Sequence, residues 1–199
     1  MATKKTVRMK TVHLEEVIIP IVGMTGLLVD AFQDDAEQAI TDKSEGIRGK
    51  QKKAIKPEEE FVKAKHFARL GKEIFEAFPA YGFKRAALRG AKSAGLVMKD
   101  TAGTFHVLGD DDTQNFVRIN GESQPLKDMP KNRMGQRVIK YKAFYPEWTA
   151  DLRIMFDSNA MSLDDLYTIL HLGGFICGVG NKRPGSEQSG RFGTFDIKR

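Results

Sequence analysis

The chain has 199 residues, the size of one domain or of one domain with a sizeable insertion, so two full domains are not expected. Hydrophobic residues make up 41% of it, and its 13 phenylalanines and 8 methionines are bulky enough to fill a core, which excludes a wholly disordered chain. The 32 lysines and arginines outnumber the 26 acidic residues and give a net charge of +6, a bias compatible with a polyanionic partner.

Residues 12–22 predict a first strand, because valines and isoleucines fill both alternating sets of positions at its end, as in a strand covered on both faces. After two glycines, the apolar spacing over residues 30–40 predicts a short amphipathic helix. Residues 43–56 contain six basic residues, one acidic residue and almost nothing to bury, which predicts a basic loop. A solvated loop and a loop that contacts nucleic acid are both compatible with that composition.

Residues 57–70 begin with a proline and three glutamates, which predicts a helix start, although the end of this segment also permits a strand. Residues 83–94 predict a helix with an alanine-rich apolar stripe and a separate basic stripe. Residues 104–108 and 115–119 predict the two strands of a hairpin around an acidic turn. A loop is expected over residues 120–134.

Residues 148–156 alternate between apolar and polar side chains, which predicts a strand with one buried face. Residues 137–144 are expected to pair with it as a hairpin. Ser162 with Asp165 three residues later predicts a capped helix start.

Gly173 and Gly174 are expected to end this last helix. Residues 175–179 and 192–197 then predict two short strands that flank a glycine-rich loop.

The predicted elements follow one another as strand, helix, strand or hairpin, strand, helix and strand. This is the order of an α+β, ferredoxin-like (RRM-like) split βαβ sheet with its helices on one face. The remaining residues fit two insertions, at about 23–79 and 110–136, within a single domain that spans residues 1–199.

The cysteine and histidine content and the length of the apolar stretches indicate which cofactors and which cellular location to expect. Cys177 is the only cysteine, which excludes an intramolecular disulfide and a cysteine-based zinc site. The four histidines lack metal-ligand spacing, so neither a metal nor another cofactor is expected. The longest apolar stretch, residues 17–22, is much shorter than a membrane span, and no secretion signal precedes it. We therefore expect a cytoplasmic protein without a membrane partner.

The glycine-rich segment at residues 173–195 is the densest chemical signal. Glycines allow backbone amides to approach a phosphate, and Lys182, Arg183 and Arg191 would neutralise its charge. A turn that only joins two strands explains the glycines as well. The glycine spacing matches neither a dinucleotide-binding fingerprint nor a P-loop, which disfavours Rossmann-type and P-loop enzymes.

Two resemblances concern this segment and the whole chain. Gly178-Val-Gly180, a basic stretch and Gly190-Arg-Phe-Gly193 before a closing strand resemble the glycine-rich loop of the repeat-associated (RAMP) RNA-binding superfamily in CRISPR effector complexes. Through residues 21–29, 145–148 and 174–180, the chain also resembles a phage-encoded protein family of undetermined function. The superfamily resemblance implies an RNA-recognition-type sheet, finger-like and thumb-like insertions, and head-to-tail assembly along a single strand. It assigns loop positions only to Gly178, Gly180, Gly190 and Gly193.

Basic clusters from distant parts of the chain are predicted to meet in one groove that binds single-stranded DNA or RNA through its backbone, with strong salt dependence. A basic surface without a groove is the alternative. The predicted contacts are Lys50, Lys52, Lys53, Arg85, Arg89, Lys92, Arg133, Arg137, Lys140, Lys182, Arg183 and Arg191. Tyr141, Phe144 and Tyr145 are next to basic residues in the sequence. Their rings could stack on bases, or they could pack within a sheet.

Three hypotheses follow. The preferred one is a phage-encoded, non-catalytic protein that coats single-stranded DNA or RNA as a homo-oligomer or filament in the host cytoplasm. The second is an endoribonuclease of the same fold that uses one residue among His13, Asp30, Asp34 and His66. The third is a structural or inhibitory phage protein that binds only other proteins.

Overall fold

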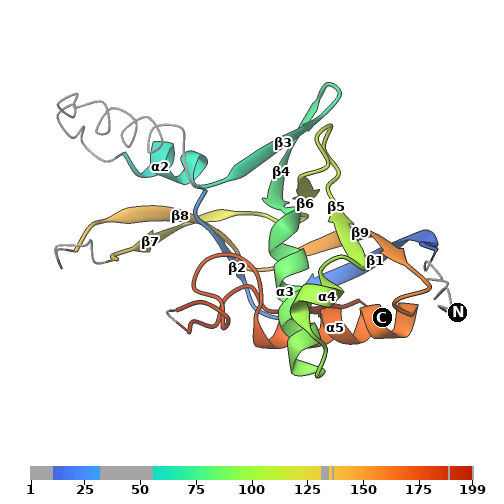
Figure 1. The fold of residues 1–199 in the computed structure, drawn as a ribbon. Helices are drawn as coiled ribbons and strands as arrows, with labels where there is room; N and C mark the ends of the chain where they lie inside the picture. Colours follow the sequence, from blue (N-terminus) through green and yellow to red (C-terminus); the bar gives the residue numbers. More distant parts are fainter. Residues whose placement is uncertain (1–10, 32–55, 131–134, 136, 188, 199) are drawn as a thin grey trace, which may run out of the picture.

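The computed structural model describes residues 11–31, 56–130, 135, 137–187 and 189–198 (Figure 1). Over these residues it is an α+β protein whose strands form one four-stranded sheet and two three-stranded sheets. The predicted helix at residues 30–40 and the basic loop at 43–56 lie almost entirely outside the described residues. So do Asp34 and four of the predicted nucleic-acid contacts: Lys50, Lys52, Lys53 and Arg133.

The four-stranded sheet is antiparallel throughout. Its strands, in spatial order, are β10 (Phe195–Ile197), β1 (Leu14–Gly23), β9 (Thr149–Asp157) and β5 (Phe105–Leu108). The alternation predicted for β9 is confirmed, because its even-numbered residues from Ala150 to Phe156 are buried. The closing strand β10 is shorter than predicted and begins only at Phe195.

Strand β1 lies between β10 and β9, but only one of its faces is covered. Ile19 and Ile21 are fully buried, whereas Ile18 is 63% exposed. The neighbour of Ile18 in the register is Arg153 of β9, so polar side chains share the open face. The prediction that both faces of this strand are covered is therefore wrong.

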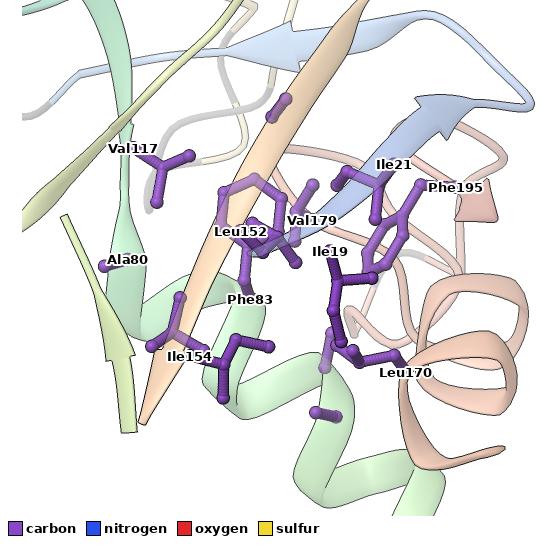
Figure 2. Packing of buried hydrophobic residues seen from close by; sticks show 14 of the residues in the cluster. Ile19, Ile21, Ala80, Phe83, Val117, Leu152, Ile154, Leu170, Val179 and Phe195 are labelled. Atoms are coloured by element: carbon purple, nitrogen blue, oxygen red, sulfur yellow. The ribbon is translucent and has the colours of Figure 1, made fainter. Parts of the chain in front are cut away.

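Two 14-residue helices, α3 (Ala80–Ser93) and α5 (Leu163–Ile176), pack against each other and cover the buried face of this sheet. Figure 2 shows Phe83 of α3 and Leu170 of α5 close to Ile19 and Ile154 of the sheet. The capping box predicted for α5 is confirmed, since the side chains of Ser162 and Asp165 each accept from the other's backbone amide.

The two glycines near the end of α5 do not terminate the helix, which continues to Ile176. The strand predicted at residues 175–179 is therefore wrong. A Cβ atom on Gly173 would lie 2.2 Å from the carbonyl oxygen of Ala86 in α3, and one on Gly90 would lie 2.0 Å from that of Ile169 in α5. These glycines let the two helix backbones approach closely, so packing rather than capping accounts for them.

The two smaller sheets contain the remaining strands. One consists of β2 (Leu27–Val29), β8 (Lys140–Tyr145) and β7 (Gln124–Asp128), and the other of β3 (His66–Leu70), β4 (Glu73–Pro79) and β6 (Phe116–Arg118). The short helices are α2 (Pro57–Lys63) and α4 (Met98–Thr101). The segment at residues 57–70 thus contains both elements that its sequence permits, the helix α2 followed by the strand β3.

Both predicted hairpins are wrong, although most of their strands exist. Strand β5 pairs with β9 while β6 pairs with β4, and β8 pairs with β2 and β7 rather than with β9. The predicted loop at residues 120–134 contains β7. In each case a strand from a distant part of the chain replaces the expected sequence neighbour. Among the described helices, none combines the length and apolar character needed to cross a lipid bilayer.

Candidate nucleic-acid interface

Two adjoining pockets lie between α3 and residues 177–187 of the glycine-rich loop. The first, about 650 Å³, lies at the N-terminal half of α3, and the second, about 530 Å³, lies beside its C-terminal half. Arg89, Cys177, Gly185 and Ser186 line both pockets, so the two lie side by side. Figure 1 shows the loop, in red, beside α3 and next to β2, where the amide of Asn181 donates to the carbonyl of Leu28. We call these two adjoining pockets together the basic groove.

One side of the groove is a polar face of α3. Arg85 and Arg89 are one helical turn apart and Lys92 follows almost one turn later, so the three cations share this face. All three side chains are exposed, and none forms an ion pair or hydrogen bond within the part of the chain that the structure describes. The basic stripe predicted from the sequence therefore borders a real groove.

The N-terminus of α3 opens into the same groove. Its N-cap, Pro79, provides no side-chain cap, and Tyr81 and Gly82 of the first turn line the larger pocket. The Ala80 amide already donates to the carbonyl of Asn115 at 2.8 Å, but the helix dipole still places partial positive charge at this end of α3. This potential adds to that of the two arginines.

The loop on the other side of the groove is held by its glycines. Gly178, Gly180 and Gly193 have left-handed φ angles of 63°, 80° and 69°. A Cβ on Gly190 would lie 1.9 Å from the carbonyl oxygen of Lys182, which is too close for any side chain. All four positions named by the resemblance thus serve to fold the loop tightly.

Two of these glycine amides are already engaged within the chain. The amide of Gly193 donates to the carbonyl of Gly26 at 2.9 Å, and that of Gly178 donates to the carbonyl of Gly173 at 3.0 Å. Neither amide is available to bind a phosphate. The cationic side chains, rather than these amides, are therefore the groups that would bind an anion.

Lys182 and Arg183 both line the groove, but within the described residues only Lys182 is paired with an acidic side chain. The Arg183 guanidinium donates to the carbonyl of Gly180 at 2.9 Å, a neutral partner within the loop. The Lys182 ammonium lies 2.7 Å from the Asp128 carboxylate of β7. Lys182 therefore fixes the loop to β7 through Asp128, whereas the Arg183 guanidinium is the loop cation that could bind an anion in the groove.

Asp128 is the centre of an ion network behind the loop. Its carboxylate also lies 2.8 Å from the ammonium of Lys142, whose side chain is only 4% exposed. The Lys142 ammonium donates to Asn181 of the loop at 3.3 Å and lies 3.6 Å from Asp30. Burial alone would raise the pKa of Asp128, but hydrogen bonds and charges from Lys142 and Lys182 lower it to about 2.

This network yields a stability prediction. At pH 7, Asp128→Asn is expected to lower the free energy of unfolding by about 2 kcal/mol, the equivalent of the pKa depression of Asp128. A depressed pKa stabilises the fold above the ordinary value of 3.8 and stops doing so as the pH falls toward 2. The difference between the two proteins should therefore disappear over that interval in urea titrations. Asp100→Asn, at an exposed carboxylate of α4, is the matched control, and an equal loss there would contradict the prediction.

The other predicted cations are placed differently. Lys140 lies 3.8 Å from Asp30, which itself lines the larger pocket. Arg137 and Arg191 are exposed but line neither pocket. The basic groove thus brings together five of the predicted contacts: Arg85, Arg89, Lys92, Lys182 and Arg183.

Neither pocket of the groove is lined by Tyr141, Phe144 or Tyr145, the aromatic residues singled out in the sequence. Tyr145 is fully buried and donates to Glu76 at 2.6 Å, and its burial together with that acceptor raises its pKa. Phe144 packs against Phe192 with the ring centroids 5.7 Å apart. The exposed aromatic in the groove is Tyr81, which sequence reasoning missed. Its spacing of four and eight residues from the two arginines was the available signal.

Two of the candidate catalytic residues meet in the larger pocket. His66 and Asp30 both line it, and burial lowers the pKa of His66. His13 lies elsewhere, beside Asp157 and Ser158 at the end of β9. No cluster of three or more histidine, cysteine or acidic residues suited to a metal ion occurs in the described ranges.

Comparison of the sequence with protein-family models and with curated proteins finds no match.

Proposed function

We propose that this protein binds single-stranded DNA or RNA in the basic groove, chiefly through the phosphate backbone. The observation that carries the proposal is the pair Arg85 and Arg89, two cations with no ion pair among the described residues, on one side of a groove whose other side presents Arg183. An extended polyanion placed along α3 would contact these groups in succession. The exposed Lys92 would continue the path into the smaller pocket.

We also propose that the four-stranded sheet with α3 and α5 is a ferredoxin-like core. Its elements follow the chain as β1, α3, β5, β9, α5 and β10, and the sheet order β10-β1-β9-β5 corresponds to fourth, first, third and second strand. Every segment of the two smaller sheets except β8 lies within the two predicted insertions. This arrangement supports the resemblance to the repeat-associated superfamily.

The proposed biological role follows that resemblance. The protein would coat a single strand as a homo-oligomer or filament in the cytoplasm of a phage-infected cell. Binding through phosphates makes the affinity fall steeply with salt, with about 0.7 counterions released for each phosphate contacted on a single strand.

Gel retardation of a labelled single strand of about 30 nucleotides tests the binding directly. Retardation at low salt that is lost as salt rises is the expected result. The absence of retardation at low salt, with protein at tens of micromolar, would remove the proposal and favour a protein that binds only other proteins. Duplex of the same sequence is the matched control.

A second candidate function, RNA cleavage, is supported by one observation: His66 and Asp30 line the same pocket as the arginines. Because its pKa is lowered, His66 is neutral near pH 7 and is able to accept a proton. The arginines would then stabilise the charge that develops on the phosphate. Shortened RNA in the retardation samples, lost in His66→Ala but not in His13→Ala, would favour this function over simple binding.

A further inference from the structure

The wide end of the basic groove contains groups that phosphate binding does not use. The larger pocket is lined by Tyr81, His66 and Phe78 as well as by the arginines, and Asp30 also lines it. Its volume of about 650 Å³ is in the range of pockets that bind small ligands. A phosphate alone would make no use of the Asp30 carboxylate and would leave the aromatic side chains without a role.

Tyr81 is positioned as a stacking surface. Its side chain is 71% exposed, so it contributes little to the core. It lies one helical turn before Arg85, about 6 Å along the axis of α3. A nucleotide whose phosphate contacts Arg85 would therefore have its base within reach of the Tyr81 ring.

The carboxylate of Asp30 has two ion pairs but no hydrogen-bond donor among the described residues. Its side chain is 23% exposed, and the nearest cations, Lys142 and Lys140, are 3.6 and 3.8 Å away, beyond hydrogen-bond length. No hydrogen bond to this carboxylate exists within the described part of the chain. An ionised carboxylate only accepts hydrogen bonds, so its complement is a ligand with N–H groups.

These three features together describe one occupant. We propose that the larger pocket binds a guanine base of the strand held in the basic groove, with Tyr81 stacking on the ring and Asp30 accepting from its Watson–Crick edge. Guanine alone among the common bases presents two adjacent donors there, N1–H and the exocyclic amino group, which match the two oxygens of a carboxylate. This inference rests on the proposed function and adds a base preference to it.

The test compares two oligonucleotides and needs no variant. Each is an oligouridine of about 15 nucleotides with one central guanosine or, in its place, inosine, which lacks only the exocyclic amino group. We expect the wild-type protein to bind the guanosine form about tenfold more tightly, measured by fluorescence anisotropy. Equal affinities would overturn the guanine pocket and leave strand binding intact, whereas no binding to either would overturn the proposed function itself.

Variants then assign the roles within the pocket. Asp30→Asn is expected to abolish the guanosine preference, while Asp100→Asn retains it. Tyr81→Ala should weaken binding of the guanosine oligonucleotide about tenfold, and Tyr81→Phe should restore it, because both aromatic rings stack. A guanosine preference that persists in Asp30→Asn, or a Tyr81→Phe variant as weak as Tyr81→Ala, would contradict these assignments.

Discussion

Replacing both Arg85 and Arg89 by alanine is expected to weaken binding of a single-stranded oligonucleotide about a hundredfold at low salt. Neither side chain has an acidic partner in the described residues, so the free protein loses no ion pair when they are removed. Each charged contact with a phosphate is worth about 1.4 kcal/mol or more, which is tenfold in affinity. The measurement is a titration followed by fluorescence anisotropy.

The salt dependence of the same variant separates direct phosphate binding from general charge. If both arginines bind phosphates, the slope of log affinity against log salt should become shallower by about 1.4, or about 0.7 for each phosphate that the variant no longer neutralises. The matched control is Lys72→Ala with Lys99→Ala, which removes two exposed charges that line neither pocket. An equal loss of affinity in this control would mean that net charge, rather than the basic groove, attracts the strand.

The second large effect concerns the crossing of α3 and α5. Gly90→Ala is expected to lower the free energy of unfolding by about 2 to 4 kcal/mol, although alanine normally stabilises a helix interior by about 1 kcal/mol. The new Cβ would lie 2.0 Å from the carbonyl oxygen of Ile169 and 2.6 Å from the amide nitrogen of Gly173. Both are backbone atoms, so relief requires the helices to move apart. Urea unfolding measures the change.

Gly103→Ala is the control for this prediction. A Cβ at Gly103 would meet no atom within 4 Å, and its φ lies outside the left-handed region. Its stability should therefore change by no more than about 0.5 kcal/mol. A Gly90→Ala protein as stable as wild type would show that the two helices are not in the close contact described.

Because α3 also forms one side of the basic groove, the destabilised variant should bind a single strand more weakly as well.

Local patterns in the sequence were sufficient for the elements nearest the site. The apolar stripe of α3 places Phe83, Ala86, Ala87 and Ala91 in the core, and the arginines on its other face follow from the same periodicity. The start of α5 could be predicted because a capping box is a contact between residues three positions apart. Such features depend only on residues that are close together along the chain.

Strand partners were beyond the same reasoning. Residues 137–144 and 148–156 each contain a strand, yet β8 pairs with β2 and β9 pairs with β1, across more than a hundred residues of sequence. Alternation reports which side chains of a strand are buried but carries no information on which strand lies beside it. The glycines of α5 could not be interpreted from the sequence for a similar reason. Glycine is favoured both at a helix end and at a close crossing of two helices, and only the structure shows which of the two applies.

By itself, then, the sequence determined the α+β composition, the buried faces of α3 and β9, and the presence of a basic helix stripe before a glycine-rich loop. Only the tertiary structure decided which cations are free. Lys182 and Arg183 are adjacent in the sequence, but Lys182 is paired with Asp128, 54 residues away, while the partner of the Arg183 guanidinium among the described residues is the neutral carbonyl of Gly180. The available charge on a side chain depends on the partners that folding brings to it, and those partners come from distant segments.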